Sequence, residues 1–328
     1  MNVKMHAALE RWPLLAPFTI TGYTWDCVEV LVVRLELEGF QGRAEAAGVY
    51  YKGDTPAAML QQLESLRRDI EGGLDRDRLQ HILPAGGARN ALDCALWELE
   101  ARIAERPVWR IAGLDCPRPL LTTFTCGADT PERMALAARR YQDARALKLK
   151  LTGDPSDADR VRSVREARQD VWMAVDANQG FTREGLEKLI PVLIEARVSL
   201  IEQPLRVGQE ALLDGFNSPV PLAADESLQT RADLPSLVGR FNMVNIKLDK
   251  CGGLTQGLEI ARAARNLGLQ VMVGNMMGTS LAMAPAFLVG QLCDVVDLDG
   301  PAFLEKDRPE SVHYEDGRID CPDNVWGS

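Results

Sequence analysis

The sequence lacks the features that mark membrane, secreted and nucleic-acid-binding proteins. None of its apolar stretches is long enough to cross a bilayer, and the opening MNVKMHAALERW has no apolar core of a secretory signal. It also has no block rich in Lys and Arg, and its net charge of −10 disfavours nucleic acid or an anionic membrane as a partner. We therefore expect a cytoplasmic protein that acts on a small molecule and binds neither nucleic acid nor membrane.

Closely spaced cysteine pairs are also missing. The seven cysteines are scattered without any CxxC spacing: Cys27, Cys94, Cys116, Cys126, Cys251, Cys293 and Cys321. This scatter is typical of free thiols in a reducing compartment, and it disfavours a disulfide framework or a zinc site.

A repeat of about two dozen residues begins near residue 118, where short apolar runs start to alternate with amphipathic helical stretches. The runs are 120–126, 145–150, 171–176, 198–202, 220–225, 242–247, 269–274 and 294–299. Strands that alternate with helices predict a parallel sheet, and eight of them fit a closed (β/α)8-type barrel. No G-x-G-x-x-G follows the first run, which disfavours a dinucleotide site.

The N-terminal part does not follow this repeat. A strand is expected near Val3–Trp12 and another in the β-branched run 28–39, and helical spacing follows in TPAAMLQQLESLRRDIEGGL and ARNALDCALWELEARIA. Strands followed by helices indicate an α+β domain. We predict a capping domain over 1–117, a barrel over 118–300 and a tail, 301–328, that packs back on the cap.

Three successive runs end with an acid: Asp176, Glu202 and Asp225. The active site of such a barrel lies at the carboxyl ends of its strands, so acids on neighbouring strands should converge. Oxygen ligands of this kind suit Mg²⁺. In the simpler alternative, each acid caps the next helix or pairs with a basic loop residue.

Lysines end the second and sixth runs. Lys150 and Lys247 are four strands apart in a ring of eight, so they should face each other across the barrel mouth. Lys148 alternates onto the same face one layer deeper, where its charge is expected to lower the pKa of Lys150. A neutral lysine beside a divalent cation can remove a proton α to a carboxylate, and the cation then stabilises the enediolate.

These motifs resemble the muconate-lactonizing subgroup of the enolase superfamily. The stretches ALKLK, VDANQG, IEQP, ADES, NIKLDKCGG and VGNMMGTS follow the order and spacing of that family. The resemblance implies an α+β cap on a modified TIM barrel, (β/α)7β, with Mg²⁺ as cofactor. It also implies metal ligands at Asp176, Glu202 and Asp225 and catalytic bases at Lys150 and Lys247.

The resemblance implies further site residues. Asn178 and Glu226 would support the metal ligands, and Lys148 and Met276 would contact the substrate. The D-x-D of VVDLDGP resembles that of dipeptide epimerases, in which it holds the substrate's α-ammonium group. In this chain the pair is Asp297 and Asp299.

One departure concerns the substrate's side chain. Relatives that act on alanyl-glutamate often carry an arginine in the loop after the first strand, but here that loop reads PFTITGYTWD. Lys52 is the nearest cation that could replace it. Alternatively, an aromatic wall for an apolar side chain would come from four residues, namely Tyr23, Trp25, Tyr50 and Tyr51.

The leading hypothesis is an isomerase, a dipeptide epimerase that inverts the α-carbon of the C-terminal residue by two-base 1,1-proton transfer. The alternatives on the same scaffold are an N-acylamino-acid racemase and a cycloisomerase or o-succinylbenzoate-synthase-like lyase. An acid-sugar dehydratase would need a barrel histidine, and His6, His81 and His313 all lie away from the expected strand ends. A non-catalytic metal-dependent binding protein would not need the lysine pair. We expect a homo-oligomer.

Overall fold

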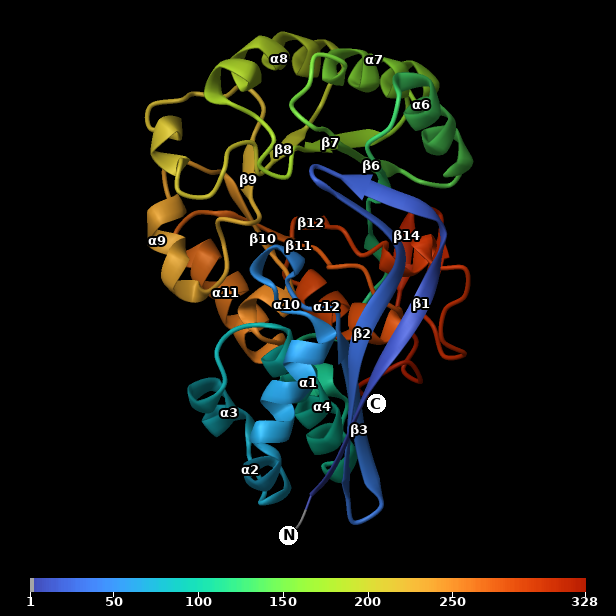
Figure 1. The fold of residues 1–328 in the computed structure, drawn as a ribbon, viewed down its shortest axis with the longest axis vertical. Helices are drawn as coiled ribbons and strands as arrows, with labels where there is room; N and C mark the ends of the chain where they lie inside the picture. The colour runs from blue at the N-terminus through green and yellow to red at the C-terminus, as the bar shows by residue number, and fades with distance from the viewer. Residues whose placement is uncertain (1–2) are drawn as a thin grey trace.

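Three long antiparallel strands open the chain in the computed structural model, which describes residues 3–328 (Figure 1). They are β1 (Lys4–Ile20), β2 (Tyr23–Leu37) and β3 (Phe40–Ala46). In β2, Leu31, Val33 and Leu35 are fully buried in the main core. The far ends of β1 and β2 form a hairpin that reaches over the barrel (Figure 1).

Helices complete the cap. They are η1 (Tyr50–Lys52), α1 (Pro56–Ser65), α2 (Arg67–Glu71), α3 (Arg76–Ile82), α4 (Gly87–Ile103) and α5 (Val108–Ile111). Helix α4 is buried over almost its whole length between the cap sheet and the barrel. Its first residue is glycine because a Cβ there would overlap the Met59 side chain and the Gly48 backbone. Strands and then helices are the α+β order that the sequence predicts.

Eight parallel strands form a curled sheet in chain order. They are β5 (Phe124–Cys126), β6 (Ala146–Lys150), β7 (Trp172–Asp176), β8 (Leu200–Glu202), β9 (Leu222–Ala224), β10 (Met243–Ile246), β11 (Gln270–Val273) and β12 (Val295–Val296). The N–H of Thr123, just before β5, donates to the carbonyl of Val296 on β12 at 3.0 Å and so joins the two edges. The fold class predicted from the sequence, a capped and modified TIM barrel, is confirmed.

Helices cover the outside of this sheet (Figure 1). They are α6 (Pro131–Arg140), α7 (Asp157–Ala167), α8 (Arg183–Glu195), α9 (Leu234–Leu237), α10 (Leu248–Cys251), α11 (Leu254–Asn266) and α12 (Ser280–Gly290), with η2 (Glu210–Leu213), η3 (Arg231–Asp233) and η4 (Gly300–Phe303). The connection from β8 to β9 departs from the predicted repeat, because it contains only η2 and no α-helix.

The first predicted strand is divided between two sheets. Leu120–Leu121 (β4) pairs with β14 (Arg318–Asp320) of the tail hairpin, whose other strand is β13 (His313–Glu315), and only Phe124–Cys126 joins the barrel. The break falls at Thr122 and Thr123. Here the chain passes from the tail hairpin to the barrel. The N–H of Thr122 donates to the carbonyl of Gly317 in the tail hairpin at 3.0 Å, and Thr122 Oγ1 accepts a hydrogen bond from the N–H of Leu298, just after β12, at 3.0 Å.

The C-terminal tail contacts the cap as well as the barrel. Arg308 donates to Glu45 of β3 at 2.6 Å and to Glu10 of β1 at 2.7 Å, and the Trp326 indole donates to the carbonyl of Arg43 at 2.8 Å.

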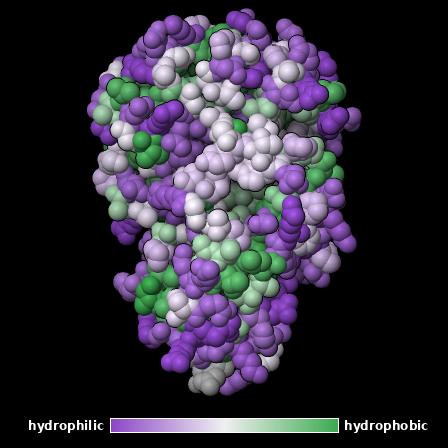
Figure 2. Space-filling view, in the orientation of Figure 1, coloured by the Kyte–Doolittle hydropathy of each residue, from purple (hydrophilic) through white to green (hydrophobic). Residues whose placement is uncertain are grey.

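Hydrophilic residues cover most of the barrel helices in the view of Figure 2, and apolar residues gather in the lower half, over the cap. Within residues 3–328, no helix combines the length and apolarity that a membrane crossing requires.

Candidate active site

Three strand ends bring the predicted acids together. Asp176 and Glu202 are the last residues of β7 and β8 and pair in register, and Asp225 follows β9 directly. One carboxylate oxygen from each lies within 4.8 Å of the others, and all three residues are at most 1% exposed. The three acids that the sequence singled out therefore form one buried cluster.

Glu202 carries the clearest sign of a cation site in this cluster. Its Oε1 accepts a hydrogen bond from Asn245 Nδ2 at 2.6 Å, but its buried Oε2 accepts none from any described residue. Burial, followed by the charge of Asp176, raises the pKa of Glu202 to about 7. The nearest cation to Oε2 is the ammonium of Lys148 at 3.5 Å. Three buried carboxylates, one of them with an oxygen that accepts no hydrogen bond, fit a hard divalent cation, which would coordinate that oxygen and offset their mutual repulsion.

The two predicted bases lie on opposite flanks of the cluster. Lys150, at the end of β6, donates to Asp176 Oδ2 at 2.6 Å and to Asn178 Oδ1 at 3.0 Å. Lys247, directly after β10, donates to Asp225 Oδ2 at 2.7 Å. Burial alone would lower the pKa of Lys247, but the surrounding carboxylates together outweigh burial and raise that pKa well above its usual value; Asp225 contributes most, followed by Glu202, Glu226 and Asp176. The acids therefore do have basic partners, and those partners come from neighbouring strands.

Lys148, which the sequence places one layer deeper than Lys150, is surrounded by carboxylates. Its ammonium pairs with Asp297 and lies 3.5 Å from Glu202 Oε2 and 4.0 Å from Asp176 Oδ2. Burial opposes its charge, but these carboxylates outweigh burial and raise the pKa of Lys148. Lys148 therefore links the acid cluster to the end of the barrel sheet.

The D-x-D pair lies beyond β12 at the barrel's closure and is buried. Asp297 accepts hydrogen bonds from Lys148 and from the Thr123 hydroxyl, and Asp299 Oδ2 accepts one from the N–H of Thr125 at 2.7 Å. Burial and the neighbouring charge of Asp297 raise the pKa of Asp299 to about 6. Both acids thus have partners within the chain, and Asp297 has the cationic one.

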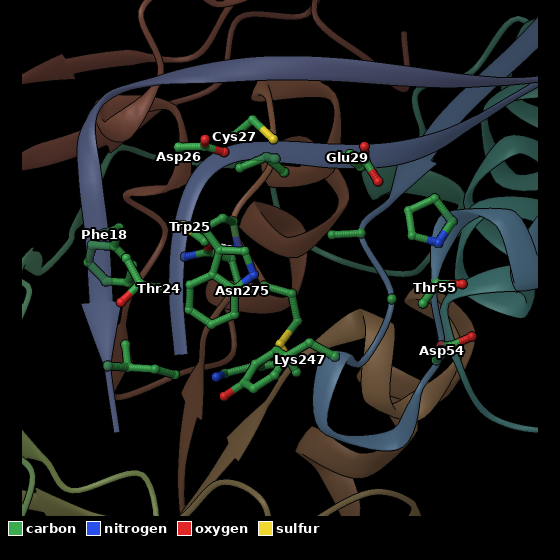
Figure 3. Close-up of a pocket in the computed structure, with 18 of the residues that line it drawn as sticks. Phe18, Thr24, Trp25, Asp26, Cys27, Glu29, Asp54, Thr55, Lys247 and Asn275 are labelled. Carbon is green, nitrogen blue, oxygen red and sulfur yellow. Dashed lines mark hydrogen bonds between the residues drawn. The ribbon is translucent and has the colours of Figure 1, made fainter. Parts of the chain in front are cut away.

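Residues of the cap and the barrel together line a cavity of about 350 Å³, which lies next to Lys247 (Figure 3). The β1–β2 hairpin contributes Trp25, the loop after β3 contributes Tyr50, and the loop after β11 contributes Met276. Lys150 and Lys247 line the barrel side. The cap therefore places aromatic side chains over the lysines, and the barrel loop after β11 adds the thioether of Met276. The predicted contact of Met276 with the substrate stays a prediction.

The predicted aromatic wall is only partly at the cavity. Tyr23 stacks on Trp25 with ring centroids 5.6 Å apart, and Tyr50 packs edge-on against both rings and against Tyr51. Of these four, Trp25 and Tyr50 line the cavity. Lys52 does not line it, because it ends η1 on the exposed side of the turn. Lys52 is thus not placed to replace the missing arginine.

The residues expected to support the metal ligands contact each other. Asn178 Nδ2 donates to Glu226 Oε1 at 3.3 Å. Burial and then the charge of Asp225 raise the pKa of Glu226 to about 8, and its Oε2 has no hydrogen-bond partner within the described part of the chain. The pair bridges the loops after β7 and β9.

Sequence reasoning missed three polar residues at this site. Lys250 donates to Asp225 Oδ1 at 2.5 Å, and burial lowers its pKa. Asn245 bonds Glu202, and Asn275 lines the cavity and donates to the carbonyl of Asp297 at 2.8 Å. A signal for Lys250 was present in NIKLDK, because a residue three places after Lys247 returns to the same side once the chain turns into a helix.

Comparison with known protein families gives an unambiguous assignment. The enolase C-terminal domain-like family matches residues 132–325, and the N-terminal domain of mandelate racemase and muconate lactonizing enzyme matches residues 2–113. The chain belongs to the mandelate racemase and muconate lactonizing enzyme family. This membership confirms the resemblance to the enolase superfamily inferred from the motifs.

Three members of the superfamily illustrate the similarity. The chain is 39% identical to the L-Ala-D/L-Glu epimerase of Escherichia coli over 94% of this chain and 97% of that protein. It is 38% identical to an N-acetyl-D-glutamate racemase of Pseudoalteromonas over 91% and 95%. The crystal structure of a dipeptide epimerase from Enterococcus faecalis complexed with Mg and L-Leu-L-Tyr superposes with a TM-score of 0.91, at 28% identity over 98% of each chain. These relatives confirm the predicted enzyme class, an isomerase of the epimerase and racemase type.

Proposed function

We propose that this family member is a Mg²⁺-dependent epimerase that inverts the α-carbon of the C-terminal residue of a dipeptide. The observation that carries the proposal is the placement of Lys150 and Lys247. Each ammonium bonds a different acid of one buried cluster, and both line a single roofed cavity.

Asp176, Glu202 and Asp225 would hold the metal. Their burial, their mutual distance and the unbonded oxygen of Glu202 fit that role. When bound, a divalent cation would lower the pKa of the adjacent lysines and stabilise negative charge on the substrate's carboxylate.

The two lysines would then act on opposite faces of the substrate's α-carbon. The lysine on one face takes the α-hydrogen as a proton, which leaves the electron pair delocalised onto the substrate's carboxylate as an enediolate. The ammonium on the other face donates a proton to the same carbon and restores the opposite configuration. Trp25 and Tyr50 would hold the substrate in place between the two lysines, since both line the cavity on the cap side.

The substrate's N-terminal ammonium would bind near Asp299. This carboxylate has neutral donors around it, the Thr125 N–H at 2.7 Å and Asn275 Nδ2 at 3.5 Å. Asp297 already carries the Lys148 ion pair, so it would act on the substrate mainly through its negative charge.

That ion pair also favours a second candidate, an N-acylamino-acid racemase. If Lys148 satisfies Asp297 and the Thr125 N–H satisfies Asp299, the D-x-D pair does not require an ammonium ligand. The 38% identity to an N-acetyl-D-glutamate racemase supports this alternative.

One assay separates the two candidates. L-Ala-L-Glu, L-Ala-L-Leu and their N-acetyl forms, together with N-acetyl-glutamate, are incubated with the protein and Mg²⁺ in deuterated water. Inversion and α-deuteration are followed by NMR. A dipeptide epimerase prefers the free dipeptides by at least about tenfold in kcat/KM, since a buried unpaired charge is costly. Faster turnover of N-acetyl-glutamate would establish the racemase instead.

A further inference from the structure

The loop that carries Tyr50 is held by an acid next to a catalytic lysine. Asp249 lies in the first turn of α10, two residues after Lys247. Its Oδ1 accepts a hydrogen bond from the N–H of Gly48 at 2.7 Å, although Gly48 belongs to the cap and is 201 positions away in sequence. Asp249 is 7% exposed, so water does not compete freely for this bond.

This hydrogen bond connects Tyr50, on the cap side of the cavity, with Lys247, on the barrel side, through only a few residues. The path runs from Lys247 along two residues to Asp249, across one hydrogen bond to Gly48, and along two residues to Tyr50. Lys247, Gly48 and Tyr50 all line the same cavity. The position of Tyr50 relative to the ammonium of Lys247 therefore depends on this one hydrogen bond and on the few residues on either side of it.

The backbone conformation of this loop also depends on Gly48. Gly48 has φ of 79°, and Gly53 at the other end of the η1 turn has φ of 69°, so glycine permits the left-handed conformation at both ends. A Cβ at Gly48 would also overlap the carbonyl of Asp54. The segment 48–53 is thus one turn between two glycines, and the buried carboxylate of Asp249 holds the first of them.

A second contact ties this turn to the barrel further along. Gln229 Nε2 donates to the Tyr51 hydroxyl at 2.9 Å. This contact lies at the end of a side chain, whereas the Asp249 bond fixes the backbone. Tyr50 lies between the two anchors and packs edge-on against Trp25 at 5.1 Å.

We propose that Asp249 is a positioning residue that sets Tyr50 over Lys247, so that the substrate cavity has its binding shape only when this carboxylate holds the cap loop. The role in substrate binding rests on the proposed function. The role in holding the loop does not, and it can be measured separately.

The kinetic test compares Asp249→Ala with Asp249→Asn on the best epimerised substrate. Alanine removes the acceptor, so KM should rise about tenfold or more with kcat changed far less, because the roof contributes to binding and not to proton transfer. Asn keeps an acceptor oxygen for the Gly48 N–H and should restore most of the lost affinity. In a double-mutant cycle, Tyr50→Ala should add little to Asp249→Ala, since both remove the same wall.

Asp93→Ala is the matched control. Asp93 is another fully buried acid at the interface of cap and barrel, and it accepts hydrogen bonds from the N–H and hydroxyl of Thr255, away from the cavity. This variant should lose stability and keep the wild-type KM. A KM that is unchanged in Asp249→Ala, or raised equally in Asp93→Ala, would overturn the proposal.

Hydrogen exchange gives a readout that needs no substrate. In Asp249→Ala the amides of 48–54 should exchange at least about tenfold faster than in the wild type, and in Asp93→Ala they should not. If the wild type epimerises nothing, the proposed function fails and this measurement still decides whether Asp249 holds the loop. Unchanged exchange in Asp249→Ala would refute that role.

Discussion

The ammonium of Lys148 and the carboxylate of Asp297 form a buried ion pair that joins β6 to the segment after β12. Both side chains are at most 4% exposed. The pair neutralises one member of the D-x-D motif from inside the chain, so the two aspartates differ in character. Asp297 is an ion-pair partner, and Asp299 is a carboxylate with neutral donors only.

This difference predicts which aspartate recognises a free N-terminus. Asp299→Asn should reduce kcat/KM for a free dipeptide by about ten- to a hundredfold, the range for loss of one charge-assisted hydrogen bond, and leave N-acetylated substrates almost unaffected. Steady-state kinetics on one dipeptide and its N-acetyl form measures this. Equal losses on both substrates would mean that Asp299 supports the barrel end without contacting the ammonium.

Asp297→Asn should act mainly on stability, because it leaves the buried ammonium of Lys148 without its nearest partner. Removing one partner of a buried ion pair costs about 3–5 kcal/mol. Urea unfolding should show a lower unfolding free energy, and Lys148→Met combined with Asp297→Asn should recover part of it. Failure of the double variant to recover any stability would argue against the pairing.

The acid cluster predicts opposite effects of Glu202→Gln with and without Mg²⁺. In EDTA the variant should melt above the wild type, because one of three crowded negative charges is gone. In Mg²⁺ the order should reverse, since saturating ligand at a hundred times Kd stabilises the wild type by about 2.7 kcal/mol. Differential scanning calorimetry in both buffers tests this, and a wild type with the same Tm in EDTA and Mg²⁺ would exclude a metal site.

The opposed lysines predict stereochemically distinct defects. Lys150→Met and Lys247→Met should each abolish inversion, because the face opposite the remaining base has lost its acid. Each variant should still exchange the α-hydrogen of one epimer only, and the two variants should exchange different epimers. NMR in deuterated water measures both outcomes, and inversion that persists in either variant would contradict the two-base mechanism.

A buried acid at the interface of cap and barrel predicts one component of the pH dependence of stability. Burial, partly offset by hydrogen bonds from Thr255, raises the pKa of Asp93 to about 6. The folded state therefore holds this proton more tightly than the unfolded chain. Its contribution favours folding at acidic pH and is lost as pH rises from about 4 to about 6.

Asp93→Asn should remove that component. The difference in unfolding free energy between the variant and the wild type should shift in favour of the variant by up to about 3 kcal/mol between pH 4 and pH 7, the equivalent of roughly two pKa units. Urea titrations at several pH values give this difference, in which other titrating groups cancel. A difference that does not vary with pH would show that Asp93 titrates normally.

The sequence determined the fold class, the family and the residues at the strand ends. Strands and helices can be predicted from local hydrophobic periodicity. In a parallel barrel, the last residues of all strands lie at the same end of the barrel. Asp176, Glu202 and Asp225 could therefore be assigned to one cluster, and Lys150 and Lys247 to its flanks, from spacing alone.

Only the tertiary structure decided how these groups pair and which loop residues reach the cavity. Lys148 pairs with Asp297 across 149 positions, and Asp249 holds Gly48 across 201, because the barrel closes and the cap docks on it. Loop side chains such as Lys52 and Tyr50 have no periodicity to assign them a face, and the turn between Gly48 and Gly53 sends the first to solvent and the second over Lys247. Long-range pairing of buried charges depends on which elements meet, and the local pattern of a sequence does not contain that information.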